Sequence, residues 1–75
     1  MKSGEKYRHY KGKEYEIIGI GYNSETLEKY IIYKGLYISK DFGENPIWVR
    51  PYDMFFEKVL IDDVLVNRFT LIKEK

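Results

Sequence analysis

The chain has 75 residues, no cysteine, a single histidine and a net charge of +1. Nucleic-acid-binding domains are typically much more basic than this. This length allows one domain at most, so we expect a single domain over residues 1–75 with frayed ends at 1–5 and 73–75. The absence of cysteine excludes disulfides and thiolate metal sites, one histidine falls short of the usual zinc ligand set, and we expect no cofactor.

The N-terminal stretch MKSGEKYRHYKG is basic and aromatic. Residues 1–13 carry five Lys or Arg and one acid, whereas residues 14–45 carry six acids and three bases. The start has no apolar leader, and no run approaches the roughly 20 apolar residues of a membrane span, so we expect a cytoplasmic protein without a membrane partner. We interpret residues 7–10 as the first strand, with Gly12 turning the chain into the next one.

Short blocks rich in Ile, Tyr and Val follow, each bounded by turn residues, and they predict strands. These strands are residues 14–22, 28–38, 47–50, 56–61 and 66–72. The polar segments between them, of which 39–46 is the longest, predict turns and loops. Pro51 is expected to end its strand and to open one helical turn over 51–55, because proline lacks an N–H donor and suits the first helical position.

These elements predict an all-β domain. At this length a sheet has to roll up to bury a core and to hide its edges. Gly19, Gly21 and Gly35 lie inside the two longest strands, where glycine permits a sharp bend or a bulge. We therefore expect a small, strongly bent SH3-like barrel of about five strands with one short helical turn. An antiparallel meander and an OB-like barrel are the alternatives.

Motifs for nucleotide binding and catalysis are incomplete. The segment GIGYNS (19–24) begins like a dinucleotide fingerprint, but Ser24 stands in place of the third glycine and no helix follows. The segment YKGKEY lacks the first glycine and the hydroxyl residue of a P-loop. His9 is the only imidazole base, and no spacing places a nucleophile beside it. We expect a protein that is not an enzyme.

The segment IWVRP sorts its side chains into two faces, because side chains at i and i+2 of a strand share a face. Ile47 and Val49 share one face and are expected to point toward the core. Trp48 and Arg50 share the other face and are expected to lie on the outside or at the barrel mouth. A Trp beside an Arg is enriched at binding hot spots, although a Trp that covers an open barrel end would look the same.

The segment YRHY divides in the same way. Tyr7 and His9 share one face, and Arg8 and Tyr10 share the other. The sequence leaves open which of the two pairs points into the core. Only the face that meets Trp48 can belong to a common binding site.

Ordered motifs over most of the chain resemble a known family. The segments YRHYKGKEYEIIGIG, NSET, LY, WVRP, MF and RF occur in that order between Tyr7 and Phe69. Together they resemble a family of short bacterial proteins classed as a domain of unknown function. The resemblance implies an SH3-like small-barrel fold and no established biochemical activity. The matching residues are Tyr7, Arg8, His9, Tyr10, Gly12, Tyr15, Ser24, Glu25, Thr26, Trp48, Arg50, Pro51, Met54 and Phe55.

Three positions depart from that family pattern. Asn23 stands where histidine is frequent, so a site with two histidines is excluded. Asp63 replaces the glycine of an Asp-Gly turn, from which we expect a looser or bulged last hairpin. Asn67 replaces a proline before the Arg-Phe pair.

We expect a small binding module that recognises a peptide segment or a protein partner through an aromatic and basic surface. Trp48 would offer flat apolar contact, Arg8 and Arg50 would bind a carboxylate, phosphate or carbonyl group, and the 23–26 turn would orient the ligand by hydrogen bonds. The candidate ligand-binding residues are Arg8, His9, Asn23, Glu25, Trp48 and Arg50. The alternatives are single-stranded nucleic-acid binding through the basic N-terminal strand and the aromatic residues, and binding of a nucleotide or small metabolite. The oligomeric state stays open.

Overall fold

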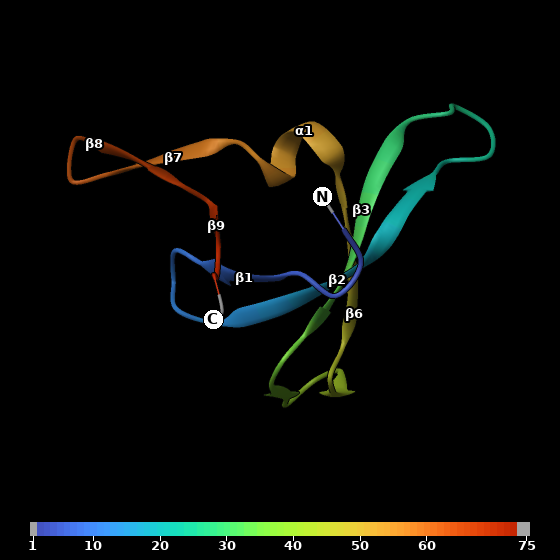
Figure 1. Cartoon of the computed structure of the whole chain (residues 1–75), viewed down its shortest axis with the longest axis horizontal. Coiled ribbons are helices and arrows are strands. Elements are labelled where there is room, and N and C mark those ends of the chain that lie inside the picture. Colours follow the sequence, from blue (N-terminus) through green and yellow to red (C-terminus); the bar gives the residue numbers. More distant parts are fainter. Residues whose placement is uncertain (1, 74–75) are drawn as a thin grey trace.

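The computed structural model describes residues 2–73, and the prediction of an all-β domain is confirmed (Figure 1). The ends of the chain at 1 and 74–75, part of the segments expected to fray, lie outside the described residues. The elements are β1 (Lys6–His9), β2 (Glu14–Tyr22), β3 (Lys29–Gly35), β4 (Ile38–Ser39), β5 (Gly43–Glu44), β6 (Ile47–Pro51), α1 (Tyr52–Phe55), β7 (Lys58–Ile61), β8 (Val64–Asn67) and β9 (Phe69–Leu71). Within residues 2–73 no helix has the length and apolar character that a membrane crossing requires.

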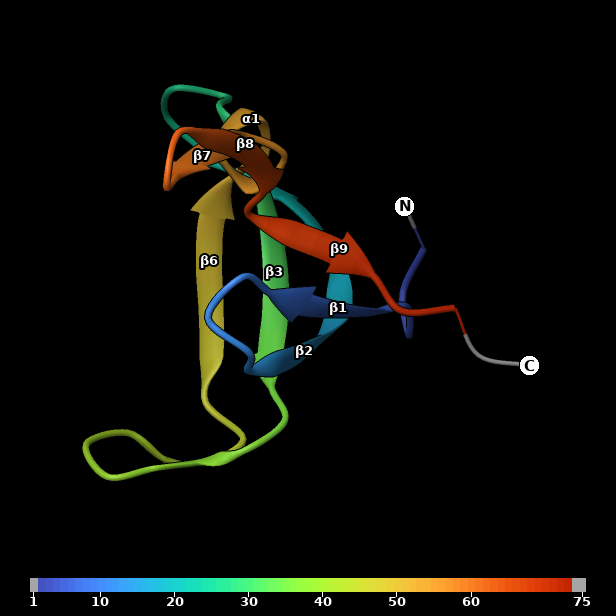
Figure 2. The same ribbon diagram turned by 90° about the vertical axis from the view of Figure 1, so that its left-hand side faces the viewer.

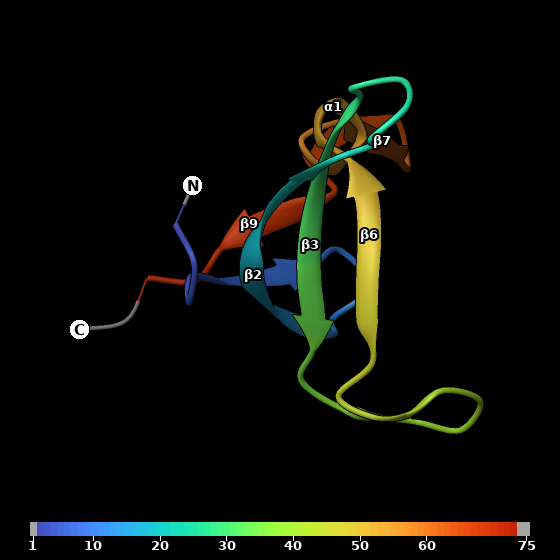
Figure 3. The ribbon, with the colours of Figure 1, turned by 90° about the vertical axis from the view of Figure 1, so that its right-hand side faces the viewer.

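The main sheet has five antiparallel strands in the order β6-β3-β2-β1-β9, so the last strand of the chain pairs with the first. Strands β4 and β5 form one separate two-stranded ribbon, and β7 and β8 form another. The five-stranded sheet coils strongly, as Figure 3 shows, but it is not closed into a barrel: β6 and β9 are its two edges. The sheet therefore buries its core on one concave face, and its edge strands β6 and β9 do not pair with each other. We call the space between these two edges, which side chains occupy, the opening.

The bend in β2 coincides with a bulge. Ile17 pairs with Tyr33 of β3, and Gly19 pairs with the next residue, Ile32, so Ile18 is an extra residue in β2. An extra residue bends the strand and increases its twist, which is the role expected for a glycine at this place. The bulge turns the second half of β2 away from β1.

Two tight turns fix the hairpins. The turn after β1 has Gly12 at φ +106°, in the left-handed region that favours glycine, and its N–H donates to the His9 carbonyl at 2.7 Å. In the β7–β8 hairpin Asp62 and Asp63 have φ of 49° and 65°. Ile61 pairs directly with Val64, so this hairpin closes in regular register and the expected bulge is absent. Two consecutive positive φ angles give a turn whose twist matches that of the strands.

The core is small and mostly aromatic. Its buried side chains are Tyr7, Ile17, Ile31, Tyr33, Phe55 and Phe69. Phe55 comes from α1, which covers one end of the sheet beside β3 and β6 (Figure 1). Tyr7 and His9 therefore belong to the inner face of β1, and Arg8 and Tyr10 are exposed, which settles the orientation of that strand.

The orientation expected for β6 is wrong. Ile47 and Val49 are 57% and 62% exposed, whereas Trp48 and Arg50 are half-buried on the inner face. The register explains this result: Trp48 pairs with the buried Tyr33, and paired residues share a face. Trp and Arg side chains are both apolar over most of their length and polar at one end. They can therefore lie on the inner face near the edge of the sheet, where their polar atoms form hydrogen bonds.

Two predicted strands divide in the structure. The expected strand 28–38 ends at Gly35, and the chain then enters the β4–β5 ribbon, which begins at Ile38 at the end of that expected strand and continues into the expected 39–46 loop. The expected strand 66–72 breaks at Arg68, because the chain leaves the β7–β8 hairpin there to pair with β1. Both predicted strands are thus interrupted where the chain changes its pairing partner, and those partners cannot be read from the local sequence.

Candidate binding site

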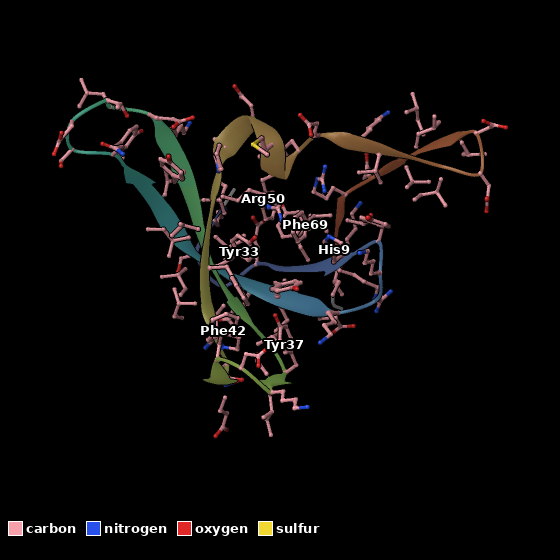
Figure 4. All side chains as sticks on the ribbon, turned by 180° about the vertical axis from the view of Figure 1, so that it is seen from behind. His9, Tyr33, Tyr37, Phe42, Arg50 and Phe69 are labelled. Atoms are coloured by element: carbon pink, nitrogen blue, oxygen red, sulfur yellow. The ribbon has the colours of Figure 1, made fainter. Side chains whose placement is uncertain are left out.

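The six candidate residues lie in three places. Trp48 and Arg50 share the inner face of the sheet with His9, and Figure 4 shows His9, Arg50, Tyr33 and Phe69 gathered in its concave side. Arg8 lies on the opposite face of β1. The remaining two, Asn23 and Glu25, belong to the β2–β3 loop. The structure thus brings together half of the expected site.

The ring of His9 packs in the opening of the sheet. Its centroid lies 5.0 Å from that of Phe69, edge to face, and 4.5 Å from that of Tyr10. Its Nδ1 atom accepts a hydrogen bond from the backbone N–H of Lys11 at 3.1 Å. In the neutral ring the proton therefore belongs to Nε2, which leaves one N–H donor for another group.

The surroundings of His9 favour its neutral form. Burial lowers the pKa of His9 below the ordinary value of 6.5, and the positive charges of Arg50, Arg68 and Lys11 lower it further. Three cations near one imidazole make this end of the sheet electropositive.

Arg50 crosses the opening from β6. Its Nε donates to the hydroxyl of Tyr33 at 3.2 Å, and its guanidinium carbon lies 5.6 Å from the centroid of Phe69. Within residues 2–73 the arginine ion pairs join Arg8 to Glu14 and Arg68 to Glu57, so Arg50 has no carboxylate partner there. A half-buried guanidinium whose printed hydrogen bond goes to a neutral hydroxyl keeps most of its donors for a ligand.

Trp48 is held in a network of tyrosines. Its Nε1 donates to the hydroxyl of Tyr37 at 3.0 Å, and that hydroxyl lies 3.4 Å from the hydroxyl of Tyr15. Phe42 packs against the Trp48 ring edge to face at 5.3 Å, next to the β4–β5 ribbon. Burial and the Tyr37 hydroxyl raise the pKa of Tyr15, so the Tyr15 hydroxyl stays protonated. These contacts favour a structural role for Trp48 over the flat ligand contact we expected.

The other candidates have local partners. Arg8 forms an exposed ion pair with Glu14 across β1 and β2, with Nη2 and Oε2 2.8 Å apart. The Oδ1 atom of Asn23 accepts the backbone N–H groups of Glu25 and Thr26, which closes the turn. This turn lies at the far end of β2 from β1 (Figure 1), so the structure does not bring Asn23 or Glu25 to His9.

A cavity of about 650 Å³ lies beside β9 and includes His9 and Arg8 in its lining. We call it the β9 groove. Ile61 and Val66 of the β7–β8 hairpin line it together with Leu71 and Ile72, and Arg8 and Lys73 give it positive charge beside the neutral His9. Figure 2 shows the hairpin above β9 and β1. Apolar walls with a few polar groups are what ligand-binding cavities usually offer.

Sequence reasoning missed the hairpin residues of this groove. The segment KVLIDDVLV (58–66) is apolar on both sides of its turn, with no alternation between apolar and polar residues. That pattern indicates a hairpin with two apolar faces. One face, with Ile61 and Val66, lines the groove, and Leu60 and Leu65 on the other are 63% and 64% exposed.

Within the described residues no group of three or more His, Asp or Glu side chains is placed to hold a metal ion. The chemistry of this region is therefore that of arginine and imidazole donors beside aromatic rings. His9 connects its two parts, because it lines the β9 groove and also contacts Phe69 in the concave side of the sheet.

Comparison with known proteins confirms the resemblance drawn from the sequence. The family model described as "Protein of unknown function (DUF1653)" matches residues 5–71. No curated protein matches the chain. A crystal structure of a DUF1653 protein from Bordetella bronchiseptica is similar to it, with a TM-score of 0.80 and 29% sequence identity, covering 96% of this chain and 87% of the other. The fold is thus shared with a bacterial relative over nearly the whole chain.

Proposed function

The chain belongs to the DUF1653 family, and because that family's description assigns no activity, we propose from the geometry that it is a small cytosolic binding module, not an enzyme. Its ligand is an extended peptide segment of a protein partner, held in the β9 groove. The observation that carries this proposal is the position of a cavity of about 650 Å³ beside an edge strand of the sheet.

The edge of β9 supports an extended ligand. On its β1 side, the carbonyl of Arg68 accepts the Tyr10 N–H and the N–H of Ile72 donates to the Lys6 carbonyl. Because alternate residues of a strand direct their backbone groups to opposite sides, Phe69 and Leu71 direct theirs away from β1. Within residues 2–73 no strand pairs with β9 on that side. Unpaired N–H and C=O groups beside an apolar groove are the arrangement used when a peptide adds a strand to a sheet.

The lining of the groove supports a peptide with apolar and acidic side chains. Ile61 and Val66 can contact alternate apolar side chains of an added strand. Arg8 and Lys73 supply positive charge at the same cavity, and the Arg8–Glu14 ion pair is exposed, so exchange of partners at Arg8 costs little.

An amide-shift titration of the ¹⁵N-labelled chain tests the proposal. The titrants are a pool of extended peptides with mixed apolar and acidic residues, an RNA oligomer and a nucleotide pool. We expect the peptides to shift the amides of 61–66 and 69–73. Peptide shifts confined to residues outside the groove, or no peptide shifts, would overturn the proposal.

Two neighbouring substitutions separate the groove from the rest of the hairpin. Ile61→Lys places a charge in the groove and should weaken peptide binding by about tenfold or more, because a buried apolar contact is lost. Leu60→Lys places the same charge on the opposite face of the same strand and should leave binding unchanged. Equal effects of the two variants would contradict binding in the groove.

Salt dependence separates the nucleic-acid alternative. If RNA is the ligand, its affinity should fall steeply between about 50 and 200 mM salt, because phosphate contacts release counterions. A peptide that adds a few ion pairs to its apolar contacts and strand pairing should lose much less affinity over the same range of salt. Tight, salt-sensitive RNA binding with no peptide binding would replace this proposal with the nucleic-acid function.

A further inference from the structure

Two basic side chains from distant parts of the chain lie against Phe69, and a third comes near one of them. His9 comes from β1, Arg50 from β6, and Arg68 directly precedes Phe69 in the chain. The His9 ring and the Arg50 guanidinium both lie against the Phe69 ring, at 5.0 and 5.6 Å, and Arg68 is close enough for its charge to act on His9. Figure 4 shows His9 and Arg50 on either side of Phe69. We call His9, Arg50 and Arg68 the basic cluster.

Negative charge is scarce at the basic cluster. Within residues 2–73 its carboxylate is Glu57, whose Oε1 lies 3.3 Å from Nη2 of Arg68. Arg50 donates to the uncharged hydroxyl of Tyr33. The Nε atom of Arg68 is buried and has no hydrogen-bond partner among the described residues. A buried donor that stays unpaired costs free energy, and a charged donor costs more than a neutral one.

We propose that the basic cluster binds one anionic group, a carboxylate or a phosphate, beside the ring of Phe69. The two guanidinium groups supply N–H donors in the planar arrangement that fits such oxygens, and the neutral His9 supplies its Nε2 proton. Because His9 also lines the β9 groove, the anion belongs to the ligand held there; in this respect the inference rests on the proposed function.

Anion binding is coupled to the protonation of His9. The groups that face His9 are Arg50 from β6, Arg68 before β9, Lys11 in the β1–β2 turn and the uncharged Tyr10 and Tyr15 rings. A bound anion offsets the three positive charges, so it raises the pKa of His9. By linkage, the anion binds more tightly at lower pH, down to the pKa of the anion itself.

The test uses the labelled full-length chain with sodium phosphate and sodium acetate as separate titrants, at ionic strength held constant with sodium chloride. We expect saturable shifts of the Arg50 and Arg68 Nε–H signals and a rise in the pKa of His9 with at least one titrant. Phosphate alone would assign the site to phosphate, and acetate alone to carboxylate. Shifts that stay linear, or that chloride reproduces, would overturn the inference.

Matched variants locate the anion. Arg50→Gln should weaken anion binding by about tenfold or more, since one charged hydrogen-bonding partner is lost. Arg50→Lys keeps the charge without the planar guanidinium group, so its affinity for the anion should fall between those of the wild type and Arg50→Gln. Lys40→Gln removes the same charge from the exposed loop between β4 and β5 and should leave binding unchanged. Equal losses in Arg50→Gln and Lys40→Gln would show a general effect of charge and would overturn the inference.

The two proposals fail separately. If peptides bind with groove shifts while phosphate and acetate produce no saturable shift, the anion site is wrong and the groove stands. If the anions bind in the Arg50-dependent way and no peptide binds, the anion site stands and the peptide function is wrong.

Discussion

The ring of Phe69 lies flat on the ring of Phe55, with centroids 4.1 Å apart and planes 2° apart. Phe55 is in the only turn of α1, and Phe69 begins β9. This stack joins the end of the sheet at β6 and α1 to the edge strand β9. It therefore holds both sides of the opening in which His9 and Arg50 lie.

Substitution of Phe69 should destabilise the domain strongly. A buried Phe→Ala change costs about 3–5 kcal/mol, which is a large part of the stability of about 0.05–0.15 kcal/mol per residue expected for this chain. We expect Phe69→Ala to be largely unfolded and Phe69→Leu to remain folded, with a loss of about 1–2 kcal/mol in urea denaturation. Phe42→Leu, at a ring that is 66% exposed, is the control and should change stability by less than about 1 kcal/mol. A stable Phe69→Ala variant would contradict the packing described for β9.

Substitution in β6 tests the orientation of that strand. Val49→Thr keeps the shape of an exposed β-branched side chain and should change the free energy of unfolding by less than about 0.5 kcal/mol. Ile31→Thr makes a similar change in the neighbouring strand at a fully buried position and should cost about 1–3 kcal/mol, because the hydroxyl is buried without a partner. Thermal and urea unfolding of both variants measure the difference, and equal losses would restore the inward orientation of Val49.

Local pattern predicted most of the fold. The strand block 14–22, the helical turn after Pro51 and the turn at Gly12 depend on residues near one another in sequence, and the structure has all three. The faces of β6 depend on register against β3. An apolar-inward rule points Ile47 and Val49 the wrong way, because the core of this domain is lined by aromatic rings and admits Trp48 and a half-buried Arg50 instead.

The candidate site was harder to predict than the fold. Arg50 and His9 were found from residue type, and the structure places both beside Phe69. Arg68 lies in the RF motif, but nothing in the sequence shows that β9 returns to pair with β1 and brings Arg68 to this site. The contribution of Ile61 to the groove likewise depends on how the hairpin lies over β9, which no local pattern encodes.

The pH dependence of stability should carry a contribution from His9. Its folded pKa is lowered from 6.5, so the unfolded chain binds the proton more readily. The contribution of the neutral His9 to the free energy of unfolding is then fully present above about pH 6.5, and it is lost as the pH falls toward the folded pKa. Urea denaturation from pH 7.5 to 5 should show this decrease in the wild type, and His9→Gln should flatten it. A His9 that titrates above 6.5 in NMR would contradict the surroundings described for it.

A glycine at position 63 should stabilise the β7–β8 turn. Asp63 adopts φ 65°, which glycine adopts without a steric penalty, and Asp-Gly is a favoured pair for such two-residue turns. We expect Asp63→Gly to raise the free energy of unfolding by about 0.5 kcal/mol, the steric relief being reduced by the greater entropy of glycine in the unfolded chain. Gly12→Ala makes the opposite change at φ +106° and should destabilise the β1–β2 turn. Thermal unfolding should show a higher stability for Asp63→Gly and a lower stability for Gly12→Ala. A loss of stability in Asp63→Gly would contradict the turn described here.

The hairpin meets the rest of the domain at one short connection. The N–H of Arg68 donates to the carbonyl of Glu57 at 3.3 Å, and the side chains of the same two residues form the ion pair. Within residues 2–73 the strands β7 and β8 pair only with each other, so we expect this pair to act as a hinge. Hydrogen exchange should therefore open the amides of 58–67 as one unit, well before those of β2 and β3. A ligand that fills the groove would slow hydrogen exchange at the amides of 58–67 before it slows exchange elsewhere. The exchange rate of the hairpin therefore reports whether the groove is filled, even when the ligand is unidentified.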